Sequence, residues 1–238
     1  AHLKAIYADD ITGFKMLQDL KTCLFFTSRG LTPSEIAYFK TKNLVPEVFM
    51  IGYDGLAFIV NRNNSDTCIT VNDVKRVLSG QAKHWSDVYP HSNRGDIEVV
   101  FDNKASATLH YVIDSIMGGK PLTASNIVAA KNSKAVIDYV DKNVNAIGII
   151  GSNWLNDRRD TTNTTIKKNI HVMSVSIKDK ATPENSWKPY QAYLLDGRYP
   201  FVRTLYANVV DPMRALPWTF ATFITSPKGQ LILFKTGL

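Results

Sequence analysis

The sequence predicts an α/β fold, and two observations lead to that prediction. The 238 residues are 45% hydrophobic and only 21% charged, a composition that can bury a sizeable core and that excludes a disordered chain. Helix and strand patterns alternate along the whole chain, with no repeat, low-complexity tract or flexible linker. No apolar stretch approaches the roughly 18 residues that a membrane span requires. One large domain or two closely associated lobes would fit these properties.

The first strand and helix are expected near the start of the chain. Residues 23–26 form a short apolar run, and residues 32–35, Thr-Pro-Ser-Glu, follow it. The Thr hydroxyl can cap a helix, while Pro suits the first helical position and Glu the third. A second strand is expected over residues 56–60, directly after the turn residues 53–55. The order is therefore strand, turn, helix, strand.

A second helix is predicted from near residue 72. Val74, Val77 and Leu78 have the spacing of one buried helical face. Trp85 lies just beyond the end of this helix, and we expect its side chain to be buried.

The stretch after the strand at residues 97–101 is the first that suggests chemistry. Residues 102–108 are small and polar, and apolar positions at helical spacing follow over residues 109–116. Hydroxyls and unpaired N–H groups at a helix N-terminus can bind an oxyanion, because the helix dipole and the free donors point the same way. The alternative is simple capping of the helix by Asn103 or Ser106.

Charge and cysteine content add little. A net charge of +7 and a pI of about 9.3 would suit nucleic acid, an anionic surface or a small anion. Lys and Arg are scattered, however, without the basic stripe and interleaved aromatics of nucleic-acid binders. Cys23 and Cys68 lack the spacing of a zinc site, and they are either one disulfide or two free thiols. We therefore predict no metal or cofactor.

Three stretches of the sequence resemble phosphate ABC transporter substrate-binding proteins. They are TVNDVKRVLSGQAKHWSDV at residues 70–88, VVFDNKASATLHYVIDSI at 99–116 and FATFITSPKGQLILFKTGL at 220–238. Residues 145–150 and 190–206 are similar to further strands of that family, so the resemblance covers nearly the entire chain. Phe-Asp-Asn before the phosphate loop is similar to the lipoprotein-type members of the Bacteroidetes group.

The resemblance implies a type II periplasmic-binding fold, with two α/β lobes joined by crossing strands. We expect the crossings near residues 55–63 and 170–178. Lobe 1 would then contain residues 1–60 and 178–238, and lobe 2 residues 61–177. Members of this family begin with a further strand, hydroxyl-bearing loop and helix, so we expect an N-terminal unit that precedes residue 1 and carries the lipid anchor.

The second lobe is expected to supply ligand groups from the phosphate loop. In the resemblance, Ser106 and Thr108 occupy the Ser-Gly-Thr positions, with Ala107 in place of Gly. Asp102 stands where the family usually has Arg, followed by Asn103, so a charge-assisted fork is lost at that position. Asp102 is either a ligand group or a cap of its own loop.

The first lobe is expected to contribute Thr27, Ser28 and Arg29. Thr27 and Ser28 align with a pair that is often Ser-Asp, and Arg29 would supply a fork to the anion or, alternatively, form an ordinary salt bridge. Protonated phosphate can donate a hydrogen bond to a carboxylate whereas sulfate has no proton to donate, so selectivity needs an acceptor. Asp102 or Asp54 would provide it, although Asp54 is also a plausible turn cap.

The predicted function is capture of inorganic phosphate for an ABC importer by closure of two lobes over the anion. The partners would be phosphate and the membrane permease, with no nucleic acid, and the protein would be a monomer in the periplasm, anchored as a lipoprotein. Sulfate or molybdate is the alternative ligand. An enzyme is not predicted, because Ser106 and His110 lie on one helix face and no Gly-x-Ser-x-Gly motif is present.

Overall fold

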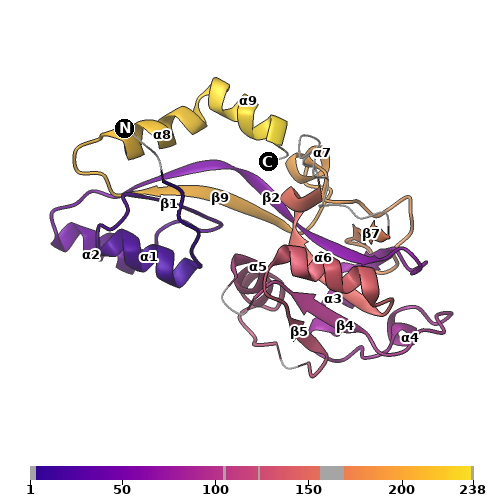
Figure 1. The fold of residues 1–238 in the computed structure, drawn as a ribbon. Coiled ribbons are helices and arrows are strands. Elements are labelled where there is room, and N and C mark those ends of the chain that lie inside the picture. The colour runs from indigo at the N-terminus through magenta and orange to yellow at the C-terminus, as the bar shows by residue number, and fades with distance from the viewer. Residues whose placement is uncertain (1–3, 104–105, 123, 156–168, 237–238) are drawn as a thin grey trace. The chain divides into compact units, whose positions relative to one another are not determined.

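The computed structural model describes residues 4–103, 106–122, 124–155 and 169–236 (Figure 1). They divide into two compact units, each containing strands and helices, so the predicted α/β class is confirmed. Unit 1 contains residues 4–52, 106–107 and 204–235, and unit 2 contains most of the remainder, from residue 53 to residue 203. Among the described residues, no helix has both the length and the apolar character to cross a membrane.

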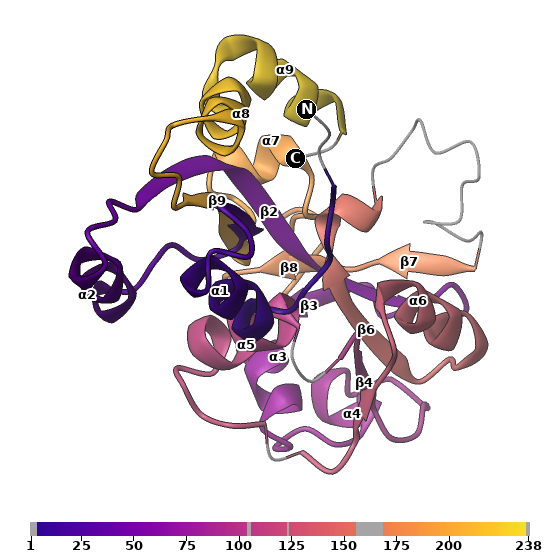
Figure 2. The ribbon, with the colours of Figure 1, turned by 60° about the vertical axis from the view of Figure 1, so that its left-hand side comes forward.

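Unit 1 is built on strands with helices on both faces (Figures 1 and 2). Its strands are β1 (Leu24–Thr27), the first part of β2 (Glu47–Asn61) and most of β9 (Val202–Val209). β1 pairs antiparallel with β9, which neighbours β2. The helices are α1 (Asp10–Gln18), α2 (Pro33–Thr41), α8 (Leu216–Thr225) and α9 (Pro227–Thr236). The core under α8 and α9 includes Ile51, Ala207, Val209 and Ala221, and that under α1 and α2 includes Leu17, Phe39 and Val210.

The start of α2 has the capping box that the sequence predicted. The Thr32 hydroxyl accepts a hydrogen bond from the Glu35 backbone N–H at 3.2 Å, and the Glu35 carboxylate accepts one from the Thr32 backbone N–H at 2.7 Å. Pro33 occupies the first turn, where its missing N–H has no intrahelical partner to lose. These bonds satisfy two of the donors that a helix leaves unpaired at its N-terminus.

Unit 2 contains the larger part of the sheet. β2 pairs antiparallel with β6 (Ala146–Gly151) and with β7 (Ile170–Val172), and β6 pairs parallel with β4 (Glu98–Phe101). β4 in turn pairs parallel with β5 (Ile127–Ala129), while β3 (Cys68–Thr70) and β8 (Ser174–Ser176) form a separate parallel pair. The helical segments are α3 (Val71–Leu78), α4 (Trp85–Val88), α5 (Ala107–Tyr111) with the π-helix Val112–Ile116, α6 (Ser133–Lys142), the 3₁₀ turn Ser152–Leu155 and α7 (Gln191–Leu195).

Two apolar clusters pack against opposite faces of the unit 2 sheet. Alternate residues of β2 point to opposite sides, so Phe58 joins the cluster that holds the α3 face and Ile59 joins the one that holds α6. The predicted α3 face is confirmed, because Val74, Val77 and Leu78 are all buried. Trp85 is fully buried, as expected, and its indole N–H donates to the Asn145 carbonyl at 3.0 Å.

The connections between the units differ from the expected crossings. β2 and β9 each contain residues of both units, with the divisions between Gly52 and Tyr53 and between Arg203 and Thr204. The family resemblance predicts a return near residues 170–178, with residues 178–238 in the first lobe. β7 and β8 instead pair with β2 and β3 inside unit 2, and the Leu56 N–H donates to the Phe201 carbonyl at 2.9 Å. These pairings keep the chain in unit 2 until residue 203.

Cys23 and Cys68 are both free thiols, which is one of the two states that the sequence left open. Cys23 lies in unit 1 and Cys68 in unit 2. Both residues are half-buried, and burial raises the pKa of Cys23.

Gly13 in α1 provides a direct test of how α1 packs on β1. A Cβ at this position would lie 2.2 Å from a ring atom of Phe25, whereas a Cβ at Gly52 would meet no heavy atom within 4 Å. In an open helix, Gly→Ala stabilises by roughly 0.5–1 kcal/mol. We expect Gly13→Ala to destabilise instead, by about 1–3 kcal/mol, and Gly52→Ala to be nearly neutral in urea unfolding. Equal stability of the two variants would contradict the tight packing.

Candidate functional site

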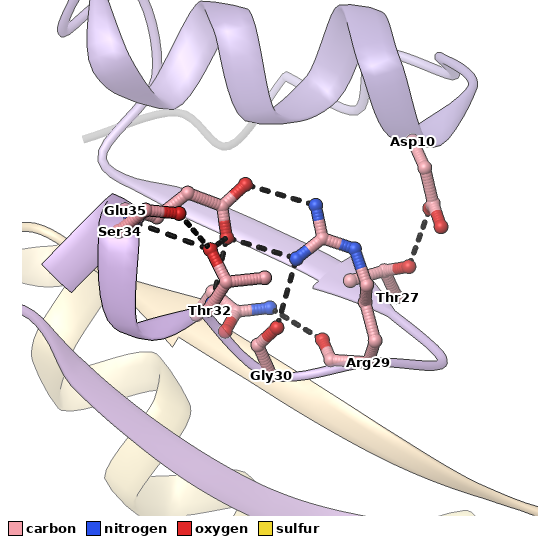
Figure 3. Close-up of polar contacts among 8 residues, drawn as sticks. Asp10, Thr27, Arg29, Gly30, Thr32, Ser34 and Glu35 are labelled. Atoms are coloured by element: carbon pink, nitrogen blue, oxygen red, sulfur yellow. Dashed lines mark hydrogen bonds and ion pairs between the residues drawn. The ribbon is translucent and has the colours of Figure 1, made fainter.

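The loop after β1 carries the three residues expected from the first lobe. Thr27 is buried at the end of β1, and its hydroxyl donates to the Asp10 carboxylate at 2.5 Å (Figure 3). Asp10 is the first residue of α1 and is also largely buried. Because the Thr27 proton is directed to Asp10, the Thr27 oxygen is left to act as an acceptor. Ser28 is half-buried beside it.

Arg29 is already engaged by a carboxylate. Its guanidinium donates to both oxygens of Glu35 at 2.9 Å and to the Gly30 carbonyl at 3.0 Å, as Figure 3 shows. It also lies over the ring of Phe14, 3.5 Å from the centroid. The geometry is that of the salt bridge which the sequence left open as the alternative. An anion at this loop would have to share the fork with Glu35.

Two polar side chains of unit 1 were not recognised from the sequence. One is Asp10, which brings a carboxylate to the expected ligand loop. The other is Asn208 in β9, whose side-chain NH₂ donates to the Arg29 carbonyl at 3.1 Å while its Oδ1 is buried with no partner among the described residues. Neither contact has a local sequence signal, because Asp10 is 17 residues from Thr27 and Asn208 is 179 residues from Arg29.

In unit 2, Asp102 follows β4 and is held by its surroundings. One carboxylate oxygen accepts the Asn103 backbone N–H at 3.0 Å, and the other lies 3.5 Å from the Ser133 hydroxyl at the start of α6. This arrangement is the loop cap that the sequence left open as the alternative to a ligand role. Asn103 itself is exposed, and residues 104 and 105 of the expected phosphate loop lie outside the described residues.

Ser106, Ala107 and Thr108 lie at the start of α5. Ser106 and Thr108 are only 8% and 5% exposed, and Ala107 is the first residue of the helix. The division between the units passes through this stretch, with residues 106–107 grouped in unit 1 and Thr108 in unit 2. α5 continues directly into the π-helix Val112–Ile116, a form that often occurs at functional sites. Two buried hydroxyl side chains therefore lie at the start of α5.

Asp54 is the most deeply buried of the expected ligand residues. Its carboxylate accepts hydrogen bonds from the Ser152 backbone N–H at 3.1 Å and from the Ser152 hydroxyl at 2.7 Å. The other carboxylate oxygen forms an ion pair with Arg203, and both side chains are more than nine-tenths buried. Ser152 and Arg203 were not recognised from the sequence as partners of Asp54, although an Arg between the apolar residues of the 200–205 stretch was a visible signal.

The structure thus gathers the expected residues into separate groups. Thr27 and Arg29 form one in unit 1 with Asp10 and Glu35, and Asp54 forms another in unit 2 with Ser152 and Arg203. Within the described ranges, no three His, Cys, Asp or Glu side chains gather in a way that could hold a metal ion. The chemistry available is hydrogen-bond donation from hydroxyl, guanidinium and backbone N–H groups.

A substitution at Glu35 measures how much the ion pair with Arg29 contributes to the free energy of unfolding. The hydrogen bond from Arg29 lowers the pKa of Glu35 below its ordinary value of 4.5, so the folded state gains stability while Glu35 is ionised. We expect Glu35→Gln to cost about 1 kcal/mol at pH 7, because the pair is bidentate but partly exposed. The difference from wild type should shrink as the pH falls below 4.5. A pH-independent difference in urea unfolding would contradict this account.

Comparison with known proteins identifies the family. A family model described as a PBP superfamily domain matches residues 3–228. The phosphate-binding protein PstS of Staphylococcus saprophyticus is 25% identical over 197 residues, covering 82% of this chain and 56% of that protein. PstS of Staphylococcus epidermidis is 25% identical over 227 residues, covering 92% of this chain and 64% of that protein. The chain thus spans about three fifths of the length of these relatives.

Solved structures show the same fold. A putative phosphate ABC transporter substrate-binding protein from Clostridium perfringens, with bound phosphate, has a TM-score of 0.71 at 20% identity, covering 95% of this chain and 82% of that one. An ABC-type phosphate transport receptor from Vibrio cholerae has a TM-score of 0.69 at 21% identity, covering 95% and 83%. The expected periplasmic-binding fold is therefore confirmed, and the chain belongs to the PBP superfamily, within which its sequence is similar to phosphate-binding proteins named PstS.

Proposed function

We propose that this chain binds inorganic phosphate as the solute-binding component of an ABC importer. The observation that carries the proposal is the pair of buried hydroxyls, Ser106 and Thr108, at the start of α5. A hydroxyl can donate a hydrogen bond to an anion, and a helix N-terminus adds backbone donors and partial positive charge. The names of the relatives from Staphylococcus agree with phosphate as the ligand.

Acceptor groups support phosphate over a fully ionised oxyanion. Protonated phosphate can donate a hydrogen bond, and a carboxylate near the anion would favour it over sulfate by leaving sulfate with an uncompensated charge. Asp10 in unit 1 and Asp102 in unit 2 both lie beside expected ligand residues. We assign the acceptor role to one of these two carboxylates, since Asp54 is committed to Arg203 and Ser152.

We propose binding without a chemical step. The geometry offers donors and acceptors. Ser106 directly precedes the short helix α5 and His110 lies within it, an arrangement that leaves the histidine off the line that a nucleophile and its base require. Closure of the two units on the anion, docking on a membrane permease, a monomeric state and a lipid-anchored position outside the cytoplasmic membrane complete the proposal. Each of these last features rests on the family resemblance.

Isothermal titration of the folded, phosphate-free chain tests the ligand assignment. We expect saturable binding of phosphate at pH 7 and no binding of sulfate at the same salt concentration. Tighter binding of sulfate or molybdate would replace phosphate with that oxyanion. A folded chain that binds none of the three would contradict the proposed function.

The double variant Ser106→Ala with Thr108→Ala tests the site. Hydrogen bonds to a charged group are worth roughly 1.5–3 kcal/mol each, so the loss of both hydroxyls should weaken phosphate binding by about 100-fold or more. Ser115→Ala is the matched control, because Ser115 is an exposed hydroxyl residue in the π-helix that continues α5. The site assignment fails if the double variant binds phosphate as tightly as this control.

A further inference from the structure

Arg203 is a buried cation whose hydrogen-bonding capacity is only partly used. It lies in β9 and is 8% exposed. Its Nη2 pairs with the Asp54 carboxylate, but its Nε is buried with no hydrogen-bond partner among the described residues. A buried unpaired donor costs roughly 1–3 kcal/mol, and more when the group is charged. Buried polar groups are normally hydrogen-bonded, so we expect this donor to have a partner that is not among the described residues.

The backbone next to Arg203 is built to admit this side chain. A Cβ at Gly151, the last residue of β6, would lie 3.0 Å from Arg203 Nη2 and 3.2 Å from the Asp54 carboxylate. Ser152 fixes the same carboxylate through two hydrogen bonds, and its hydroxyl accepts the Gly55 N–H at 2.9 Å. The guanidinium is therefore held in one orientation, which lowers the entropy cost of using its remaining donor.

The helix that carries a proposed ligand hydroxyl is tied to the same strand. The Tyr111 hydroxyl of α5 donates to the carbonyl of Val202, the residue before Arg203, at 2.9 Å. Burial raises the pKa of Tyr111, and the positive charge of Arg203 acts in the opposite direction, which indicates that the two side chains interact electrostatically. Thr108 is three residues before Tyr111 in α5 and so lies on the same helix face.

We propose that Arg203 is a phosphate-binding residue of unit 2, using its unpaired Nε–H to donate to the anion next to the Thr108 hydroxyl. Asp54 is then a positioning residue that orients the guanidinium and does not touch the ligand. The inference rests on the proposed function. Arg203 would supply the cationic donor that is missing from the loop after β4, where Asp102 stands in place of the Arg that the family resemblance leads us to expect. Arginine suits this role because one fork can serve a carboxylate and an oxyanion together.

Arg203→Lys is the first test, because lysine keeps the charge for Asp54 but has no fixed Nε–H. We expect phosphate affinity by titration calorimetry to fall on the order of tenfold to a hundredfold, while the unfolding midpoint without phosphate changes little. Arg198→Lys is the matched control, because Arg198 pairs with Asp196 in the same unit and is about half exposed. Its phosphate affinity should equal that of wild type.

A second variant separates ligand contact from scaffolding. The double change Asp54→Leu with Arg203→Met removes the buried pair as a unit, which often preserves stability. We expect it to fold and to lose phosphate affinity as Arg203→Lys does. Asp54→Asn keeps an amide oxygen that can accept from Arg203 and so still orient the guanidinium, and it should keep or raise phosphate affinity.

The outcomes distinguish the two claims. If wild type binds phosphate and the folded Arg203 variants bind it equally well, Arg203 is not a ligand residue and the proposed function stands. If Asp54→Asn loses as much affinity as Arg203→Lys, the pair is a scaffold only, and the inference is again overturned. If folded wild type binds no phosphate, both the proposed function and this inference fail.

Discussion

The buried ion pair between Asp54 and Arg203 is the constraint that holds together the two strands connecting unit 2 to unit 1. It joins β2 and β9, the two strands that continue into unit 1, at positions next to both divisions between the units. A buried carboxylate or guanidinium without its partner is strongly destabilising, and here Ser152 adds two further hydrogen bonds. The strands that connect the units are therefore fixed in register on the unit 2 side by electrostatics as well as by backbone pairing.

The polar groups expected to bind a ligand are mostly engaged within their own unit. Thr27 donates to Asp10, Arg29 donates to Glu35, and Asp102 caps its own loop. Such bonds hold the side chains in defined positions, which reduces the entropy lost when a ligand binds. They also set a condition on any anion, because it must accept from donors that remain available, such as the backbone N–H groups of a helix start and the Nε–H of Arg203.

Local sequence patterns predicted the fold and its helix starts well, because they report interactions between neighbouring residues. The capping box at Thr32 and Glu35 and the buried face of α3 follow from spacings of three and four residues. The second connection between the units and the partners of the candidate site residues were not predictable in this way. Asp54 meets a residue 149 positions away, and only the three-dimensional fold decides that β7 and β8 stay with unit 2.

A crystal structure of the chain grown with phosphate at neutral pH is the measurement that tests this account most directly. We expect a bound phosphate whose oxygens lie within hydrogen-bond distance of the Ser106 and Thr108 hydroxyls and of Arg203 Nε. A phosphate bound away from the start of α5, or an ordered chain that holds no phosphate at saturating concentration, would contradict it.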